Sequence, residues 1–280
     1  MEREGIQMSV RLIAIDMDGT LLRSDRTISQ RTMDDLKQAI AQGIWVVPCT
    51  GRVHNNLPDP VQQLQGIHYV VSSNGANVAD LDADAVIYRN LLHKEKAVRI
   101  LKELRSRREV GLVYFEGKSY MQSSDLDIVR EALADQPEML EFFIKRQVYV
   151  KDIVDFVAQN GDIEKILIPC LTEQEEVDLW QWLEDHEEVT ITSSVKGNME
   201  INEGTANKGT GLKWLCDKLG IDASEVMALG DQKNDEGMLR YAGYSIAMGN
   251  AIPEMKAVAR YETDTNDNDG VAKAIERYAL

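Results

Sequence analysis

Positive charge is clearly outnumbered by negative charge in this sequence. Its 280 residues include 31 lysines and arginines against 47 aspartates and glutamates, which leaves a net charge of −16 at pH 7. Proteins that bind nucleic-acid polymers need a basic face, so a surface this acidic argues against a nucleic-acid partner. A small anionic molecule can still bind such a protein, provided that its site gathers positive charge locally.

Cysteines and long apolar runs are also few. Cys49, Cys170 and Cys216 are odd in number and far apart, which excludes a disulfide framework or a zinc-binding pattern and suits a reducing cytosol. No stretch is long and apolar enough to cross a bilayer, and residues 1–9 lack the apolar centre of a signal peptide. We therefore expect a cytoplasmic protein that does not span a membrane.

An apolar run near the N-terminus, residues 10–15, ends abruptly in Asp16-Met17-Asp18-Gly19-Thr20. Its length and partly β-branched content predict a strand that is buried on both faces. Residues two apart at a strand end point the same way, so we expect Asp16 and Asp18 together at the carboxyl edge of a sheet, where open α/β sheets bind ligands. Two like charges this close require a cation between them or protonation of one, and the hard cation Mg²⁺ suits carboxylate oxygens.

Two further strand candidates also end in polar residues. Residues 44–47 lead into Thr50-Gly51-Arg52, and a helix expected directly after them would make Thr50 part of an anion site. On its own, a Thr-Gly turn is more often a simple helix cap. Residues 69–71 lead into Asn74-Gly75, which fits either a turn or the lining of the same cleft. The β-α-β-α-β pattern predicts an α/β fold with a Rossmann-like, doubly wound parallel sheet.

The middle of the chain changes character. From about residue 84, strand and helix patterns alternate without a polar residue at every strand end, which predicts an inserted α+β domain over residues 84–194. Residues 1–83 and 195–280 would form the core, with hinges near residues 80–85 and 194–196. Within the insertion, Thr172 followed by Glu175 predicts a capped helix start.

After the insertion, charged residues again stand where elements begin and end. Lys208 opens an expected helix, where a lysine opposes the helix dipole unless it reaches an anion; an exposed surface lysine is the alternative. Residues 226–229 form an expected buried strand that runs into Gly230-Asp231-Gln232-Lys233-Asn234-Asp235. A carboxylate therefore follows a strand for the second time.

Four segments now stand in order: Asp16-Met17-Asp18-Gly19-Thr20, Thr50-Gly51-Arg52, Lys208-Gly209 and Gly230-Asp231-Gln232-Lys233-Asn234-Asp235. Together they resemble the four motifs of the haloacid dehalogenase superfamily of phosphohydrolases. Their order and spacing are similar to those of its Cof-like branch, which carries a class IIB α/β cap between the second and third motifs. Gly249-Asn250 and residues 266–272 also resemble that branch.

The resemblance implies a Mg²⁺-dependent phosphatase that acts on a small phosphorylated metabolite through a phospho-aspartate. It implies that Asp16 is the nucleophile, and that Asp18 is the general acid and then the general base. Asp16, the backbone carbonyl of Asp18 and Asp231 would ligate Mg²⁺, and Asp235 would support the metal site. The residues that would bind the phosphoryl group are Thr50, Gly51, Lys208 and Asn234.

Other functions stay open at this point. A phosphomutase shares the same chemistry but returns the phosphoryl group to its substrate, and a non-catalytic regulator would bind a phosphorylated metabolite without turning it over. A P-type ATPase is excluded because the sequence has no membrane spans. Sugar phosphates, phosphorylated cofactors and nucleotides all remain candidate substrates, and we expect a monomer or a homodimer.

Overall fold

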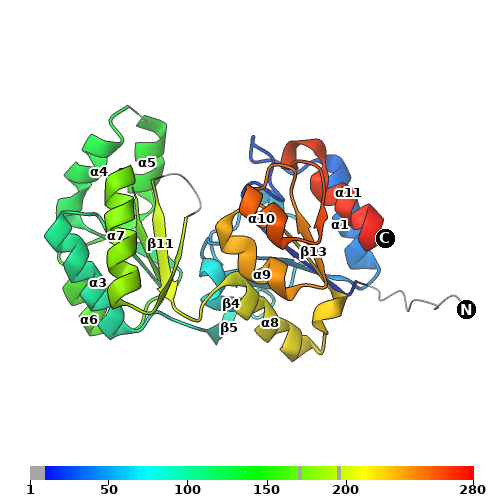
Figure 1. The fold of residues 1–280 in the computed structure, drawn as a ribbon, viewed down its shortest axis with the longest axis horizontal. Coiled ribbons are helices and arrows are strands. Elements are labelled where there is room, and N and C mark those ends of the chain that lie inside the picture. Colours follow the sequence, from blue (N-terminus) through cyan, green and yellow to red (C-terminus); the bar gives the residue numbers. More distant parts are fainter. Residues whose placement is uncertain (1–9, 136, 170–171, 194–196) are drawn as a thin grey trace, which may run out of the picture. The chain divides into compact units, whose positions relative to one another are not determined.

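The computed structural model describes residues 10–135, 137–169, 172–193 and 197–280, which fall into two compact units (Figure 1). Unit 1 takes in the described residues up to Arg52, Leu57–Tyr88 and Asn207–Leu280. Unit 2 takes in Val53–Asn56 and the described part of Arg89–Ala206. Unit 1 is therefore built from segments on both sides of unit 2 in the sequence. Among the described helices, none combines the length and the apolar character that a membrane span requires.

Unit 1 is organised by a parallel sheet with the strand order β14-β13-β12-β1-β2. The strands are β1 (Leu12–Ile15), β2 (Trp45–Pro48), β12 (Val226–Gly230), β13 (Tyr244–Ala247) and β14 (Tyr261–Glu262). β1 lies between β12 and β2 and runs parallel to both. Because the chain continues from β1 to one side and from β12 to the other, the strand order reverses between them. Open α/β sheets bind their ligands beyond the strand ends at such a reversal.

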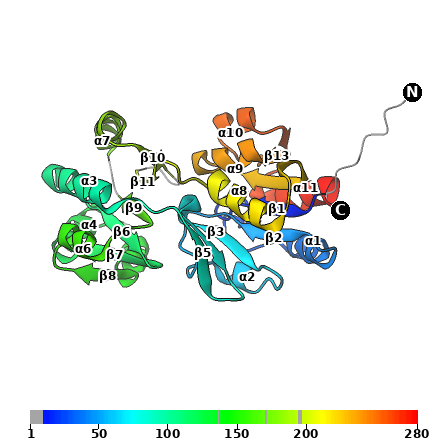
Figure 2. The ribbon, with the colours of Figure 1, turned by 90° about the horizontal axis from the view of Figure 1, so that it is seen from below.

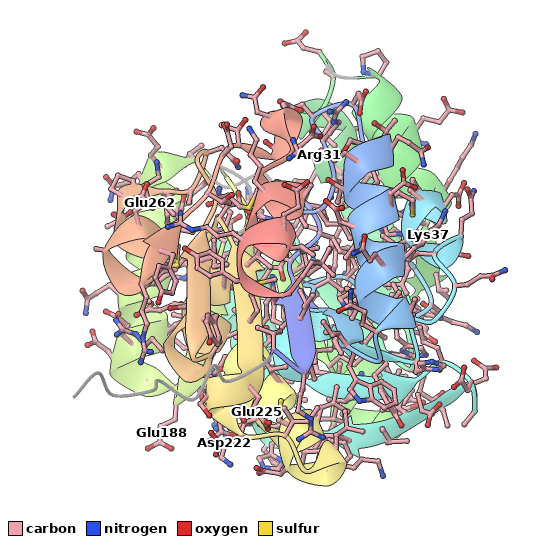
Figure 3. All side chains as sticks on the ribbon, turned by 90° about the vertical axis from the view of Figure 1, so that its right-hand side faces the viewer. Arg31, Lys37, Glu188, Asp222, Glu225 and Glu262 are labelled. Carbon is pink, nitrogen blue, oxygen red and sulfur yellow. The ribbon has the colours of Figure 1, made fainter. Side chains whose placement is uncertain are left out.

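Helices cover both faces of this sheet. They are α1 (Gln30–Ala41), α8 (Lys208–Leu219), α9 (Glu236–Tyr241), α10 (Pro253–Val258) and α11 (Gly270–Tyr278). α1 and α11 lie side by side on one face, where Arg31 donates to both oxygens of Glu276 (Figure 3). α8, α9 and α10 lie on the other face (Figure 2). Cover on both faces explains why β1 is apolar throughout, and the predicted α/β fold class is confirmed.

The sheet edge beyond β2 is extended by a second, smaller sheet of three strands in the order β3-β4-β5. These strands are β3 (Tyr69–Ser72), β4 (Asn77–Asp80) and β5 (Ala85–Arg89). A parallel bridge between Cys49 and Val71 joins β3 to the end of β2, and the N–H of Thr50 donates to the carbonyl of Val71 at 2.8 Å. The segment that follows β2 is therefore held against β3.

The helix expected directly after Thr50-Gly51-Arg52 does not begin there. Residues 51–58 form turns and loop, and the short helix α2 begins only at Asp59 and ends at Gln62. Pro58 explains the delay, because a proline disfavours helical backbone at the residue before it. Pro60 stands in the first turn of α2, a position where proline is tolerated.

Unit 2 contains a six-stranded sheet with the order β10-β11-β9-β6-β7-β8. Its strands are β6 (Leu112–Phe115), β7 (Lys118–Gln122), β8 (Gln147–Val150), β9 (Lys165–Ile168), β10 (Val189–Thr192) and β11 (Met199–Glu203). Its helices are α3 (Lys94–Arg107), α4 (Leu126–Ala132), α5 (Pro137–Lys145), α6 (Ile153–Asn160) and α7 (Glu173–His186). The capping box that Thr172 and Glu175 predicted at the start of α7 is confirmed.

Alternate residues of this sheet feed two separate apolar cores. Val113 and Ile166 pack in a core with α3, α6 and α7. Leu112 and Met121, whose side chains point to the opposite face, pack in a core with α4. Unit 2 is therefore an α+β domain with its own cores. Its role as a cap and the limits 84–194 stay predictions, and the expected hinge at 194–196 lies outside the described residues.

Candidate active site

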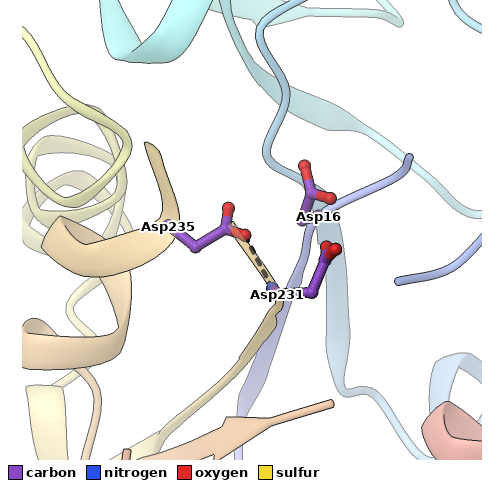
Figure 4. Close-up of side chains that lie close together, drawn as sticks. All are labelled: Asp16, Asp231 and Asp235. Atoms are coloured by element: carbon purple, nitrogen blue, oxygen red, sulfur yellow. Dashed lines mark hydrogen bonds between the residues drawn. The ribbon is translucent and has the colours of Figure 1, made fainter. Parts of the chain in front are cut away.

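The carboxylates that follow β1 and β12 meet at the point where the strand order reverses. Asp16 follows β1 directly and Asp231 follows β12. One carboxylate oxygen from each of Asp16, Asp231 and Asp235 lies within 4.8 Å of the other two (Figure 4). All three residues are buried, with exposed fractions of 6%, 3% and 0% respectively. Two motifs that are more than two hundred residues apart in sequence thus form one acidic cluster.

Lys208 supplies the positive charge of this cluster. It is the first residue of α8, after Asn207, whose side chain caps the helix by accepting from the N–H of Thr210. Its side chain is fully buried, and its Nζ donates to Asp16 Oδ1 at 2.5 Å and to Asp235 Oδ1 at 2.6 Å. The alternative of an exposed surface lysine is therefore excluded.

Burial and mutual repulsion perturb the ionisation of the cluster. Burial, followed by the nearby charge of Asp235, raises the pKa of Asp16 well above its usual value, although Lys208 opposes this. Burial also raises the pKa of Asp231 to about 6, and Asp235 adds to that effect. Burial alone would lower the pKa of Lys208, but Asp16 and Asp235 outweigh it and raise that pKa. The raised pKa values of Asp16 and Asp231 show that their negative charges are not fully compensated, whereas Lys208 is held in its charged form.

The composition of the cluster fits a hard divalent cation. Three buried carboxylates face the single ammonium of Lys208, so an excess of negative charge remains when all of them are ionised. The donor atoms are oxygens, which Mg²⁺ prefers. The backbone of Gly19 packs closely against the carboxylate of Asp231. A Cβ at position 19 would lie 2.5 Å from Asp231 Oδ2, so only glycine allows this contact.

Asp235 has little freedom to ligate a cation. Its Oδ2 accepts from the backbone N–H of Asp231 at 2.8 Å (Figure 4). The same oxygen accepts from the N–H of Gln232 at 3.0 Å, and Oδ1 accepts from Lys208. Both oxygens therefore hold neighbouring parts of the site in place. Asp231 is oriented from the other side by Thr20, whose Oγ1 donates to Asp231 Oδ1 at 2.9 Å.

The carboxylate of Asp18 lies outside the cluster and pairs with Arg52. The Nε of Arg52 donates to Asp18 Oδ2 at 2.9 Å and its Nη2 donates to Asp18 Oδ1 at 2.7 Å. The Asp18 side chain is 55% exposed, in contrast to buried Asp16. Asp18 and Arg52 come from the first two motifs, yet sequence reasoning gave Arg52 no role.

Of the residues expected to bind a phosphoryl group, Thr50 and Asn234 are placed by contacts with β3 and the turn after it. Thr50 is 1% exposed, and its Oγ1 accepts from the N–H of Arg52 at 3.1 Å. Asn234 belongs to the 3₁₀ turn η4 (Lys233–Asp235), and its Nδ2 donates to Asn74 Oδ1 at 3.3 Å. Asn74-Gly75 therefore is a turn, as one of its two interpretations had it, and it also lies beside the site residues.

A second asparagine, Asn250, was noted only as part of a resemblance. Its Nδ2 donates to the carbonyl of Gly19 at 2.8 Å and lies 3.5 Å from Asp231 Oδ2, while its Oδ1 accepts from the N–H of Asn266. Long-range contacts of this kind leave no local pattern in the sequence. Besides the resemblance, the available signal is that Gly249-Asn250 lies just beyond the end of a strand, here β13.

Comparison with known proteins gives consistent matches over nearly the whole chain. The family model described as haloacid dehalogenase-like hydrolase matches residues 13–275. The 5-amino-6-(5-phospho-D-ribitylamino)uracil phosphatase YcsE of Bacillus subtilis (strain 168) is 31% identical over 100% of this chain and 99% of its own. Phosphatase YwpJ of the same strain is 31% identical over 94% of this chain and 98% of its own.

Solved structures agree. A haloacid dehalogenase-like hydrolase from B. subtilis, 31% identical, covers 97% of this chain and 100% of its own with a TM-score of 0.82. A structure described as a subclass IIB sugar phosphatase of the same superfamily, 25% identical, covers 96% of this chain and 99% of its own with a TM-score of 0.79. Both likenesses extend over the two units.

Proposed function

The chain belongs to the haloacid dehalogenase-like hydrolases and is a phosphatase, and we propose that it dephosphorylates a small phosphorylated metabolite with Mg²⁺ through a phospho-aspartate at Asp16. The observation that carries this proposal is the buried cluster of Asp16, Asp231 and Asp235 around Lys208 at the strand-order reversal. A cluster of this charge suits a cation and a phosphoryl group.

In the proposed first step, an oxygen of Asp16 attacks the phosphorus of the substrate. A bond forms between Asp16 and the phosphorus, and the bond from the phosphorus to the leaving oxygen breaks. Asp18 gives its proton to that leaving oxygen. Since both oxygens of Asp18 contact Arg52 in this structure, Asp18 has to exchange the guanidinium for the substrate before it can act.

In the second step, water attacks the phosphorus of the phospho-aspartate. Asp18 takes a proton from this water, the bond from Asp16 to the phosphorus breaks, and inorganic phosphate leaves. Lys208, Thr50, Gly51 and Asn234 would hold the phosphoryl oxygens throughout. Mg²⁺, held by Asp16, Asp231 and the carbonyl of Asp18, would neutralise the charge that builds up on those oxygens.

The substrate class follows from the relatives only in outline. One is named for a phosphorylated ribitylaminouracil and another is described as a sugar phosphatase. We infer that this chain acts on a sugar phosphate, a phosphorylated cofactor or a nucleotide. A phosphomutase remains the second candidate because it needs the same groups. Retention of Asp16, Lys208 and Asp231 in one cluster disfavours a regulator without activity.

The test is hydrolysis of p-nitrophenyl phosphate with and without Mg²⁺. We expect activity that is lost on chelation with EDTA and restored by Mg²⁺, and an acid-stable phosphoryl group on the peptide that contains Asp16 after rapid quenching. Asp16→Asn should abolish turnover without unfolding the protein, because an amide is a poor nucleophile and a weaker metal ligand.

A matched control is Asp217→Asn, which removes an exposed carboxylate that pairs with Lys213 on α8. It should leave hydrolysis unchanged. Activity in Asp16→Asn above a few per cent of wild type, after deamidation has been excluded, would contradict the assignment of Asp16.

A further inference from the structure

Three consecutive residues after β3 have left-handed backbone. Ser73, Asn74 and Gly75 have φ angles of 50°, 56° and 88°, and together they form the short turn η1. Left-handed backbone is unfavourable for residues with a Cβ, although asparagine tolerates it better than most. Ser73 and Asn74 are 0% and 1% exposed. Strained backbone persists where the surroundings hold it, and it is often found at functional sites.

The backbone of this turn holds the segment that carries Thr50. The N–H of Ser73 donates to the carbonyl of Arg52 at 2.8 Å, and the N–H of Asn74 donates to the carbonyl of Thr50 at 3.0 Å. Two residues of the turn thus bracket Gly51. The conformation of the Thr50–Arg52 segment therefore depends on the left-handed path of its neighbour.

The same turn is packed against the start of α8. A Cβ at Gly75 would lie 2.0 Å from the carbonyl oxygen of Asn207 and 3.0 Å from the backbone nitrogen of Lys208. A Cβ at Gly211, one turn along α8, would lie 3.2 Å from the Cα of Gly75. Only glycine at position 75 allows this approach, so the turn sets where the helix that presents Lys208 begins.

The side chain of Asn74 reaches the third segment. Its Oδ1 accepts from Asn234 Nδ2 at 3.3 Å. An amide nitrogen carries two hydrogens, so this bond fixes the orientation of the Asn234 amide and leaves its second N–H for another acceptor. The turn contacts all three segments that carry Thr50, Gly51, Lys208 and Asn234.

We propose that Asn74 is a positioning residue for phosphoryl binding, which acts by orienting the amide of Asn234 toward the phosphoryl group. This inference rests on the function proposed above. Asn74 itself takes no part in bond making. The backbone of the turn keeps the Thr50 segment and the start of α8 in place, while the side-chain amide of Asn74 serves Asn234.

A double-mutant cycle separates these two roles. Asn74→Gly keeps the left-handed turn, because glycine adopts positive φ freely, but it removes the acceptor oxygen. Asn74→Asp also tolerates the turn and keeps an acceptor oxygen for Asn234. Each is combined with Asn234→Ala, and kcat/KM for p-nitrophenyl phosphate and the affinity for inorganic phosphate in the presence of Mg²⁺ are measured together with the thermal unfolding midpoint.

We expect Asn74→Gly and Asn234→Ala each to lower kcat/KM and phosphate affinity by about ten-fold, as the loss of one well-placed hydrogen bond does. The double variant should be no worse than Asn234→Ala alone. In the Asn74→Asp background, Asn234→Ala should still cost as much as it does in the wild type. The unfolding midpoint of Asn74→Gly should stay close to that of the wild type.

Effects of Asn74→Gly and Asn234→Ala that multiply, or wild-type kinetics in Asn74→Gly, would overturn the proposal. A large fall in the unfolding midpoint of Asn74→Gly, without coupling between Asn74→Gly and Asn234→Ala, would assign Asn74 to folding alone and overturn the proposal. If Asn74→Gly does not fold, the Asn74→Asp variant provides the test. If Asn234→Ala then causes no loss of kcat/KM or phosphate affinity in the Asn74→Asp background, the proposal is refuted. Calorimetric phosphate binding does not need turnover, so a wild type that binds phosphate but lacks Mg²⁺-dependent hydrolysis would refute the proposed function and not this one.

Discussion

Asp16 and Asp18 show how far a local rule extends at the scale of single residues. The rule that residues two apart point the same way holds only inside a strand. β1 ends at Ile15, and the chain turns at Met17. Asp16 therefore stays in the buried cluster, while the carboxylate of Asp18 goes to Arg52. The sequence correctly indicated acidic residues at a strand end, but not the turn that separates their directions.

Lys208 was easier to interpret from the sequence. A lysine at a helix start opposes the helix dipole unless it reaches an anion, so its position indicated a nearby anion. The structure supplies two, Asp16 and Asp235. Which carboxylates they would be depends on how β1, β12 and α8 meet, and no local pattern contains that information.

Asp231→Asn is expected to stabilise the protein in the absence of metal at neutral pH. Burial raises the pKa of Asp231 from 3.8 to about 6, so the folded state binds this proton more tightly than the unfolded chain. Stability then falls as the pH rises from about 3.8 to about 6, and the full penalty of roughly 2–3 kcal/mol applies above that window. The asparagine carries no charge and keeps an oxygen that can accept from Thr20.

The measurement is the free energy of unfolding in urea at pH 8 and pH 3 with EDTA present. The gain from Asp231→Asn should be clear at pH 8 and absent below the unfolded pKa, where both states of the wild type are protonated. Addition of Mg²⁺ should stabilise the wild type more than the variant. Equal unfolding free energies of variant and wild type at pH 8 would rule out the cost of burying the Asp231 charge that is described here.

At the scale of the elements, starts and stops were predictable wherever capping chemistry is local. Thr172 caps α7, as Thr172 and Glu175 indicated. The helix expected after Thr50-Gly51-Arg52 begins only at Asp59, because Pro58 and Pro60 favour a helix start at that point. The turn at residues 73–75 carried part of its signal locally, because Asn74-Gly75 indicates a turn. The left-handed backbone at Ser73 and the distant partners that hold the turn left no local pattern.

Asn250 ties together segments that follow three different strands. It joins the carbonyl of Gly19, after β1, to Asp231, after β12, from its own place after β13. We expect Asn250→Ala to weaken Mg²⁺ binding by about ten-fold or more, as the loss of groups that support metal ligands does. Because Asn250 is exposed, the unfolding midpoint without metal should change little.

Isothermal titration with Mg²⁺ provides the measurement, and Asn160→Ala is the matched control. Asn160 is another exposed asparagine, whose Nδ2 donates to the carbonyl of Phe156 at the end of α6. Unchanged Mg²⁺ affinity in Asn250→Ala, or an equal loss in Asn160→Ala, would show that the Asn250 contacts do not serve the proposed metal site.

At the scale of the whole molecule, alternation of strand and helix patterns was enough to predict a second α+β unit. The alternation of patterns could not predict which buried charged side chains pair on the sheet of unit 2. The ion pair of Lys165 with Glu200 at 2.6 Å joins β9 to β11, and Lys165 Nζ lies 4.8 Å from the centre of the Tyr114 ring. These contacts depend on the pairing of strands that are far apart in sequence.

We predict that substrate preference resides in unit 2. Every residue proposed here for phosphoryl transfer lies in unit 1, so unit 2 is not needed for the chemistry itself. A folded domain of this size, with its own cores and a buried charge pair, suits recognition of the part of the substrate that differs between metabolites. A purely stabilising or dimer-forming insertion is the competing explanation.

The test exchanges residues 53–56 and 89–206 for the matching residues of the Bacillus subtilis ribitylaminouracil phosphatase, with the reciprocal exchange as control. Residues 53–56 are included in the exchange because they belong to unit 2. kcat/KM is measured for that enzyme's named substrate and for p-nitrophenyl phosphate, whose small leaving group makes it the reference for unit 1 chemistry. We expect preference for the phosphorylated ribitylaminouracil to move with unit 2, while the reference activity changes little. If preference remains with unit 1 in both chimeras, unit 2 does not select the substrate, and recognition has to be sought among the residues around Asp18 and Arg52.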